Sequence, residues 1–233
     1  MTSGTRHTRA SSSPTATADR PAAAKARFWD KIARKYAADP VTDMAGYETT
    51  LARARALIAP THRVLEIGCG TGTTALRLGP CYGHLVATDV SAEMIAIARE
   101  KLAAAPQPNL EFQVVDADAL AFGQASHDVV LAFNVLHLVS DLDAALTSVE
   151  NTLAPGGLFI SKTPCIADMN PLLGKVLLPV MRLVGKAPPV LCFRAPDLQA
   201  ALTRHGLEIV AVEYHGTKGK DLRPFIVARK RGS

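Results

Sequence analysis

Residues 64–74 read V-L-E-I-G-C-G-T-G-T-T. An apolar run that carries one acid, Glu66, breaks there into three glycines at alternate positions, Gly68, Gly70 and Gly72. A glycine-rich turn between a strand and a helix lets a ligand approach the backbone at the N-terminus of that helix. The stretch therefore predicts a nucleotide-type site at the end of the first strand of an α/β sheet.

Strand-like and helix-like segments alternate along the chain on both sides of this turn. We expect strands at residues 63–68, 85–90, 110–117, 128–135, 156–162, 207–215 and 224–230. We expect helices at residues 28–36, 47–58, 73–79, 92–105, 141–153 and 197–206. Apolar strands that alternate with helices indicate a mostly parallel sheet with helices on both faces. The last two strands are joined by the short loop GTKGKD, which permits an antiparallel pair and leaves no room for a helical crossover.

The two ends of the chain differ in composition from its middle. Residues 1–27 are rich in Ser, Thr, Ala and Arg, and we expect a disordered basic tail. Their Arg- and Ser-rich, acid-poor composition also resembles an organellar transit peptide, but they lack the apolar face of such peptides. Residues 28–233 are expected to form a single α/β domain. Within it, residues 28–60 form an N-terminal helical lid and residues 164–193 a cap insert.

The distribution of charge and the cysteine content argue against several kinds of partner. Residues 28–217 carry 15 Lys and Arg against 19 Asp and Glu, so the net charge of +5 comes from the two ends of the chain. A nucleic-acid enzyme usually concentrates positive charge around its site, and we therefore expect no nucleic-acid partner. No apolar run reaches the roughly 20 residues of a membrane span. The four cysteines show no zinc-type spacing, so no metal site is expected, and we read them as reduced thiols of a cytoplasmic protein.

The acids around the glycine turn separate two cofactor classes. Asp89 ends the second expected strand and can accept both hydroxyls of a ribose. A dinucleotide site requires Gly or Ala at the sixth position of G-x-G-x-x-G/A, where this chain has Thr73. The charge of Glu66 would also repel a pyrophosphate, whereas it would attract a cation. The pattern favours a positively charged nucleoside without phosphates.

Five motifs then follow in order: VLEIGCGTG (64–72), ATDVSAEMIAIAREK (87–101), VVDADALAF (114–122), HDVVLAFNVLHLV (127–139) and LAPGGLFI (153–160). The series resembles the class I S-adenosylmethionine-dependent methyltransferases, closest to their small-molecule branch, which includes quinone-biosynthesis methyltransferases and the methyltransferase type 11 group. The resemblance covers about residues 28–230. It implies a Rossmann-like, seven-stranded, mostly parallel sheet with an antiparallel last strand, and S-adenosylmethionine as the cofactor.

The resemblance also implies roles for individual residues of the cofactor site. The loop that holds the methionine portion comprises Glu66, Gly68, Cys69, Gly70 and Gly72, and Asp89 takes the ribose hydroxyls. The remaining positions follow from the later motifs: Val90 and Met94 lie against the adenine, Asp116 and Ala117 meet its amino group, and Phe133 and Asn134 lie under the methionine portion. Met94 is equally compatible with a core position, and Asp118 is expected to cap the turn that follows it.

No motif supplies a strong general base. Such a base is needed only where the acceptor is a weak nucleophile, because the cofactor already carries an activated methyl group. His137 and Tyr47 are the candidates; a histidine that bonds a neighbouring carbonyl is the alternative for His137. Trp29 and Tyr47 are candidates for a lid over the cofactor, or for side chains that seal the edge of the sheet.

Residues 171–186, PLLGKVLLPVMRLVGK, form an apolar and basic segment within the cap insert. Leu172, Val176 and Val180 share one side of a helix, with Lys175 opposite them. The segment could roof an apolar acceptor, pack on the sheet or make peripheral contact with a membrane surface, and packing against the domain is favoured because it lacks Trp and Phe.

The function expected from these residues is methyl transfer from S-adenosylmethionine to a small, apolar or aromatic acceptor by in-line displacement. Two alternatives are a methyltransferase of a macromolecule, either protein or RNA, and a protein that binds S-adenosylmethionine without turnover. The choice among O-, N- and C-methylation and the oligomeric state stay open at this point.

Overall fold

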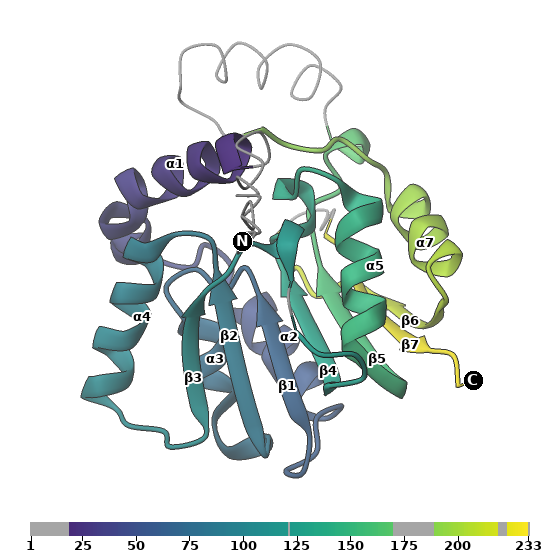
Figure 1. Ribbon diagram of the computed structural model, residues 1–233, viewed down its shortest axis with the longest axis horizontal. Coiled ribbons are helices and arrows are strands. Elements are labelled where there is room, and N and C mark those ends of the chain that lie inside the picture. Colours follow the sequence, from purple (N-terminus) through teal and green to yellow (C-terminus); the bar gives the residue numbers. More distant parts are fainter. Residues whose placement is uncertain (1–18, 121, 170–188, 219–222, 233) are drawn as a thin grey trace, which may run out of the picture.

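The computed structural model of the chain describes residues 19–120, 122–169, 189–218 and 223–232 (Figure 1). Within them, seven strands form one sheet in the spatial order β3-β2-β1-β4-β5-β7-β6. The strands are β1 (Arg63–Ile67), β2 (His84–Asp89), β3 (Leu110–Val114), β4 (His127–Phe133), β5 (Leu153–Lys162), β6 (Leu207–Glu213) and β7 (Phe225–Lys230). The predicted seven-stranded α/β architecture is confirmed.

The strand pairing agrees with the expected mixture of directions. β1 lies between β2 and β4 and pairs with both in parallel, so that Leu65 faces Val86 on one side and Val130 on the other. β7 runs antiparallel to both β5 and β6. The carboxyl ends of β1, β2, β4 and β5 therefore meet at one edge of the sheet, where ligands bind in open α/β sheets.

Helices cover both faces of the sheet (Figure 1). They are α1 (Asp19–Ala38), α2 (Met44–Arg55), α3 (Thr73–Leu78), α4 (Ala92–Ala104), α5 (Leu142–Thr152) and α7 (Ala195–Arg204). Alternate side chains of a strand point to opposite faces. Leu65 and Ile67 thus pack with residues of α5 and α7, whereas Val64 packs with residues of α2, α3 and α4. Glu66 shares the face of Val64, and its carboxylate therefore lies on the α2–α3 side of the sheet.

Helix α1 begins at Asp19, well before the predicted start at Phe28, so the boundary expected at residue 27 falls inside a helix. The expectation rested on composition, whereas Lys25 within this stretch pairs with Asp116 and Asp118, and the following turns of α1 pack on α4. Ala33 and Trp29 pack against Met94 and Ile97 of α4. The hydroxyl of Ser91 donates to Asp30 at 2.6 Å, and the same hydroxyl accepts from the backbone N–H of Met94 to cap α4.

The helix expected at residues 171–186 lies outside the described residues. Among the residues that the structure does describe, no helix is both long and apolar enough to cross a membrane.

Candidate functional site

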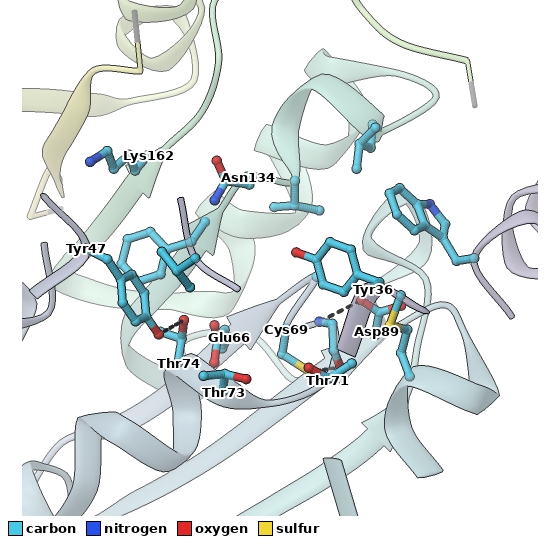
Figure 2. A pocket seen from close by; sticks show the side chains of 18 of the residues that line it. Tyr36, Tyr47, Glu66, Cys69, Thr71, Thr73, Thr74, Asp89, Asn134 and Lys162 are labelled. Atoms are coloured by element: carbon cyan, nitrogen blue, oxygen red, sulfur yellow. Dashed lines mark hydrogen bonds between the residues drawn. The ribbon is translucent and has the colours of Figure 1, made fainter. Parts of the chain in front are cut away.

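A cavity of about 690 Å³ opens at the carboxyl ends of β1, β2, β4 and β5, with α1 and α2 forming its other wall (Figure 2). It lies where β1 is flanked by strands whose connections leave in opposite directions, which is the usual ligand position of an open α/β sheet. Its size is within the range of small-molecule sites, about 300–1,000 Å³. The cavity has one end at the glycine loop and β2, and another at α2 and β5.

The glycine loop takes a backbone conformation that only glycine adopts at low cost. Gly68, Gly70 and Gly72 all have positive φ, at 66°, 55° and 73°. The backbone N–H of Cys69 donates to the carbonyl of Thr88 at 2.8 Å, which ties the loop to β2. At Gly68 and Gly70 the loop therefore presents backbone atoms to the cavity.

Gly72 allows close packing of helices and does not line the cavity. It is absent from the residues that line the cavity, and a Cβ at this position would lie 2.6 Å from Cζ of Phe112 and 2.8 Å from Cβ of Ala98. Such distances are far below van der Waals contact, so the missing side chain is what allows α3, α4 and β3 to approach one another. The contact of Gly72 with the cofactor remains a prediction.

Glu66 is a buried acid that points into the cavity (Figure 2). Only 2% of the residue is exposed, and its Oε2 has no hydrogen-bond partner among the described residues. Burial, with a smaller contribution from Asp89, raises the pKa of Glu66 to about 8. An unpaired buried carboxyl group is costly, and a cationic ligand would supply the missing partner.

Asp89 lies at the end of β2, beside the glycine loop. Its carboxylate accepts hydrogen bonds from the backbone N–H groups of Gly70 and Ser91, both at 2.9 Å. Burial raises the pKa of Asp89, while these two bonds lower it in part. Two acids at the same end of the cavity give that end a strong preference for positive charge and for hydroxyl donors.

Lys25 of α1 closes this end of the cavity and was not singled out by the sequence. Its Nζ lies 2.5 Å from Oδ1 of Asp116 and 2.8 Å from Oδ2 of Asp118. Asp116, rather than Asp118 as expected, caps the short turn after β3, because its carboxylate accepts from the backbone N–H of Asp118 at 3.1 Å. Asp118 instead accepts from the backbone N–H of Ser140.

Aromatic side chains from the two N-terminal helices flank the cavity. Tyr36, which the sequence analysis did not select, lies over the glycine loop and stacks edge-on against Trp29 (Figure 2). The hydroxyl of Tyr47 is 3.0 Å from Oγ1 of Thr74. Burial raises the pKa of Tyr47, so its hydroxyl stays protonated at neutral pH and is a poor base.

Most residues that the sequence selected for the cofactor line this cavity together: Glu66, Gly68, Cys69, Gly70, Asp89, Val90, Met94, Asp116, Ala117, Phe133 and Asn134. Asn134 has a positive φ of 56°, a conformation that Asn tolerates better than most residues. Their contacts with the cofactor remain predictions.

His137 does not line the cavity. Its Nδ1 is buried without a partner among the described residues, and its backbone carbonyl accepts from the N–H of Leu191 at 2.7 Å. Burial lowers the pKa of His137 to about 4, so the imidazole stays neutral and is a weak base. Burial also raises the pKa of the Cys69 thiol well above its usual value, which disfavours a reactive thiolate.

Two polar residues that the sequence analysis missed line the opposite end of the cavity. Lys162 is the last residue of β5 and is 6% exposed, and its Nζ donates to the hydroxyl of Thr50 at 3.0 Å. A charged residue that ends an apolar strand was a signal for Lys162, because strand ends form the ligand edge of such a sheet. No sequence signal pointed to Thr50, which lies within α2.

The geometry at the acidic end suits one class of ligand. The unpartnered Oε2 of Glu66 accommodates a cation, the carboxylate of Asp89 accepts from hydroxyl groups, and the loop backbone permits close approach. A pyrophosphate would face two carboxylates there. The fold and the site together define a nucleotide-binding α/β domain for a positively charged nucleoside.

Comparisons with known proteins agree with this class. Residues 64–157 match the model of a methyltransferase domain family. The chain is 35% identical over 101 residues to a ubiquinone biosynthesis O-methyltransferase of Sinorhizobium fredii, covering 43% of this chain and 40% of that protein. It is 36% identical over 109 residues to the hybrid PKS-NRPS synthetase poxE of Penicillium oxalicum, covering 43% of this chain and 3% of that protein. The chain thus spans well under half the length of these relatives.

A solved structure shares the fold of this chain. A crystal structure of an S-adenosylmethionine-dependent methyltransferase from Mesorhizobium loti superposes with a TM-score of 0.67 at 23% identity, over 79% of this chain and 98% of that chain. Residues 64–157 thus match a methyltransferase domain family, and the described chain shares the fold of this S-adenosylmethionine-dependent methyltransferase. This family and this fold imply S-adenosylmethionine as the cofactor.

Proposed function

We propose that this chain transfers the methyl group of S-adenosylmethionine to a small, apolar or aromatic acceptor. The observation that carries the proposal is the buried Oε2 of Glu66, unpartnered among the described residues, beside Asp89 in a cavity of about 690 Å³. When bound, S-adenosylmethionine supplies a methyl group that is already activated by the positive sulfur. The chain would position the two reactants and exclude water.

The cofactor would lie over β1 and β2. Glu66 would pair with its ammonium group and Asp89 with its ribose hydroxyls, while Asp116 and Ala117 would meet the adenine. Because Lys25 holds Asp116 through α1, the side chain of Lys25 would shift or share that carboxylate when the adenine binds. Residues 28–60 would act as a lid over the cofactor, with Trp29 and Tyr36 on its inner side.

The acceptor would occupy the other end of the cavity, over β4 and β5. Its walls there include the apolar side chains of Leu51, Phe133 and Met169, which favours an apolar or aromatic compound. The relatives support a small acceptor, since one is named for ubiquinone biosynthesis and another is a hybrid PKS-NRPS synthetase. The insert at 164–193 would complete this end, and residues 28–233 would form one domain.

Calorimetry tests the cofactor assignment. The Asp89→Ala variant should bind S-adenosylmethionine at least about tenfold more weakly, because it loses charge-assisted hydrogen bonds to the ribose. The Asp128→Ala variant is a matched control, because Asp128 pairs with Arg63 at the far end of the sheet, outside the cavity. Equal affinity in the wild type and Asp89→Ala would remove the site assignment.

A labelling experiment tests the acceptor class. Cell extracts are incubated with the protein and methyl-labelled S-adenosylmethionine, then separated into small molecules, protein and RNA for mass spectrometry. Label in the small-molecule fraction is the expected result. Label in protein or RNA would favour a macromolecular acceptor, and cofactor binding without label in any fraction would favour a binding protein.

A further inference from the structure

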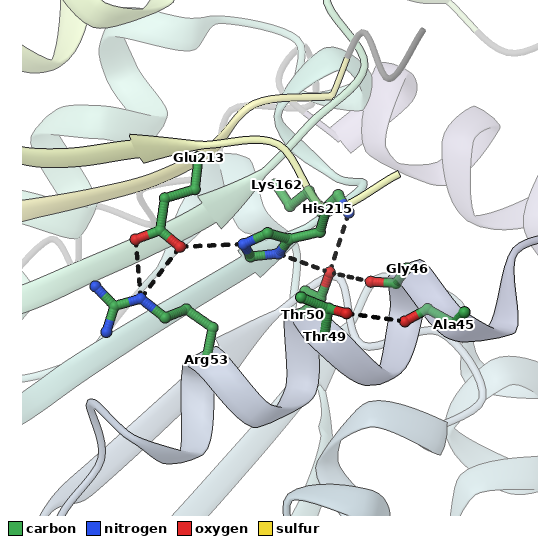
Figure 3. Close-up of polar contacts among 8 residues, drawn as sticks. All are labelled: Ala45, Gly46, Thr49, Thr50, Arg53, Lys162, Glu213 and His215. Atoms are coloured by element: carbon green, nitrogen blue, oxygen red, sulfur yellow. Dashed lines mark hydrogen bonds and ion pairs between the residues drawn. The ribbon is translucent and has the colours of Figure 1, made fainter. Parts of the chain in front are cut away.

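A hydroxyl, an imidazole and a carboxylate are linked in series behind the acceptor end of the cavity (Figure 3). Oγ1 of Thr50 lies 3.1 Å from Nδ1 of His215, and Nε2 of His215 lies 3.1 Å from Oε2 of Glu213. Arg53 holds the carboxylate from the other side, with Nε 2.8 Å from Oε1 of Glu213. Thr50 lies in α2, Glu213 ends β6, and His215 follows two positions later.

Only the first member of this series reaches the cavity. Thr50 and Lys162 line the cavity, whereas His215 lies behind Thr50 and is 8% exposed. Nζ of Lys162 donates to Oγ1 of Thr50 at 3.0 Å, and the backbone N–H of Asn134 donates to the carbonyl of Lys162 at 2.7 Å. The series therefore runs from the cavity wall, beside a buried lysine, into the protein.

The donors and acceptors fix the direction in which a proton can move. Burial raises the pKa of Glu213, but hydrogen bonds from Arg53 and His215 outweigh it and lower the pKa overall. Ionised Glu213 only accepts, so Nε2 of His215 donates to it, and in the tautomer with the proton on Nε2 alone Nδ1 is an acceptor. Lys162 only donates, so the hydroxyl of Thr50 receives from Lys162.

The proton of the Thr50 hydroxyl has two possible acceptors. Nδ1 of His215 is one, and the carbonyl of Gly46, 2.8 Å from Oγ1, is the other. In the first orientation Thr50 connects the cavity to His215; in the second it closes a bond within its own helix. Rotation of this one hydroxyl hydrogen connects or disconnects the series.

We propose that the acceptor is a weak O–H acid whose hydroxyl lies against Thr50, and that its proton passes through Thr50 to His215. The inference rests on the proposed function. As the acceptor oxygen bonds to the methyl carbon and the sulfur–carbon bond breaks with its electron pair left on sulfur, the acceptor proton moves to Oγ1 of Thr50. The original hydroxyl proton of Thr50 moves to Nδ1 of His215.

The surrounding charges suit this transfer. The imidazolium formed at His215 is paired with the carboxylate of Glu213, which Arg53 orients. The ammonium of Lys162 lies beside Thr50 and stabilises negative charge that develops on the acceptor oxygen. The relay supplies the general base that the motifs of the sequence lack, and neither His137 nor Tyr47 has the position and pKa to replace it.

A series of phenols tests the relay through the release of S-adenosylhomocysteine. At alkaline pH, 4-nitrophenol is ionised and needs no base, whereas 4-methylphenol still has to lose its proton. His215→Gln and Thr50→Val should slow methylation of 4-methylphenol about 100-fold or more, and that of 4-nitrophenol by less than about fivefold. If His215 and Thr50 were only structural, both variants would slow the methylation of the two phenols equally, and this result would contradict the relay.

Thr49→Val is the matched control. Thr49 precedes Thr50 on α2, and its hydroxyl donates to the carbonyl of Ala45 at 3.1 Å on the exposed side of the helix (Figure 3). This variant removes the same helical hydrogen bond without touching the cavity, and it should retain wild-type rates with both phenols. Thermal unfolding and calorimetry with S-adenosylmethionine confirm that each variant is folded and binds the cofactor.

Nitrogen-15 NMR of the histidine side chains tests the relay without turnover. In the protein bound to S-adenosylhomocysteine, His215 should be neutral with its proton on Nε2, and Thr50→Val should shift its Nδ1 resonance. A proton on Nδ1 in the resting protein would break the relay and overturn the proposal. A protein that binds S-adenosylmethionine but methylates none of the phenols would also overturn it, whereas failure to bind S-adenosylmethionine would instead contradict the proposed function.

Discussion

The two ends of the cavity are built in different ways. The acidic end comes mainly from one continuous segment, residues 64–74, together with Asp89 at the end of the neighbouring strand. The opposite end joins Thr50 to Lys162, 112 positions later in the chain, and to His215, 165 positions later. A backbone loop can be specified by local sequence, whereas a chain of side-chain hydrogen bonds requires the complete fold.

The electrostatics differ in the same way. Oε2 of Glu66 is buried without a partner among the described residues, and burial, with a contribution from Asp89, raises the pKa of Glu66. At the other end each carboxylate or imidazole already has a partner within the protein. The acidic end is completed by a ligand, and the end beside Lys162 is completed by the protein itself.

The largest expected effect comes from a side chain in the glycine loop. Gly68 has φ of 66°, and a Cβ there would lie 2.3 Å from Cγ2 of Val135. Gly68→Ala should lower the free energy of unfolding by about 2–4 kcal/mol through strain and overlap, and should abolish cofactor binding. Urea unfolding and calorimetry measure these two effects.

Gly156→Ala separates strain from overlap. Gly156 also has positive φ, at 77°, but a Cβ there meets no atom within 4 Å. This variant should lose only about 1–2 kcal/mol and should bind the cofactor normally. Equal losses in the two variants would mean that close approach to Val135 does not define the acidic end.

A smaller effect, with a distinctive pH dependence, is expected at Glu66. The folded state retains a proton on Glu66 that the unfolded chain releases, because burial raises the folded pKa to about 8 from the ordinary 4.5. The free energy of unfolding should therefore fall between these pH values, by up to about 1.4 kcal/mol per pH unit. Glu66→Gln should flatten this slope, stabilise the ligand-free protein at neutral pH and weaken S-adenosylmethionine binding.

Urea unfolding at several pH values between about 5 and about 8 measures the slope. The control is Glu111→Gln, which removes an exposed acid from β3. The same slope in wild type and Glu66→Gln would mean that Glu66 does not hold its proton through this range, and the contrast between the two ends would lose its electrostatic basis.

The smallest effect tests whether α1 belongs to the acidic end. Lys25→Met leaves Asp116 and Asp118 facing each other without their shared cation, which should cost about 1–3 kcal/mol and speed hydrogen exchange in α1. Arg34→Met, also on α1, breaks an exposed ion pair with Glu100 of α4 and should leave the stability nearly unchanged. Similar hydrogen-exchange rates of α1 in both variants would mean that the ion pairs of Lys25 do not hold α1 against the acidic end.

Much of the fold follows from sequence patterns. The strands and most helices lie where apolar runs, bounded by turn residues, predicted them. The short loop before the last strand permitted the antiparallel pairing that the structure has. The start of α1 was missed because residues 19–27 carry little apolar surface of their own. Within this stretch Lys25 pairs with Asp116 and Asp118 after β3, and the following turns of α1 pack on Met94 of α4.

The site was predicted unevenly for a related reason. Gly68, Asp89 and Asn134 were found because each lies at a strand end within a recognisable motif. Tyr36, Thr50 and His215 were missed because each is ordinary in its local sequence and gains a role only from what lies opposite it.

By itself, the sequence determined the acidic end of the cavity. Three glycines at alternate positions and two acids at fixed strand ends encode a backbone turn and a charge, and both are local properties. Only the tertiary structure decided which acid lacks a partner among the described residues, that Lys25 reaches Asp116, and that Thr50, Lys162 and His215 meet. Those contacts depend on distances between segments far apart in the chain, which hydrophobic packing of the whole domain sets.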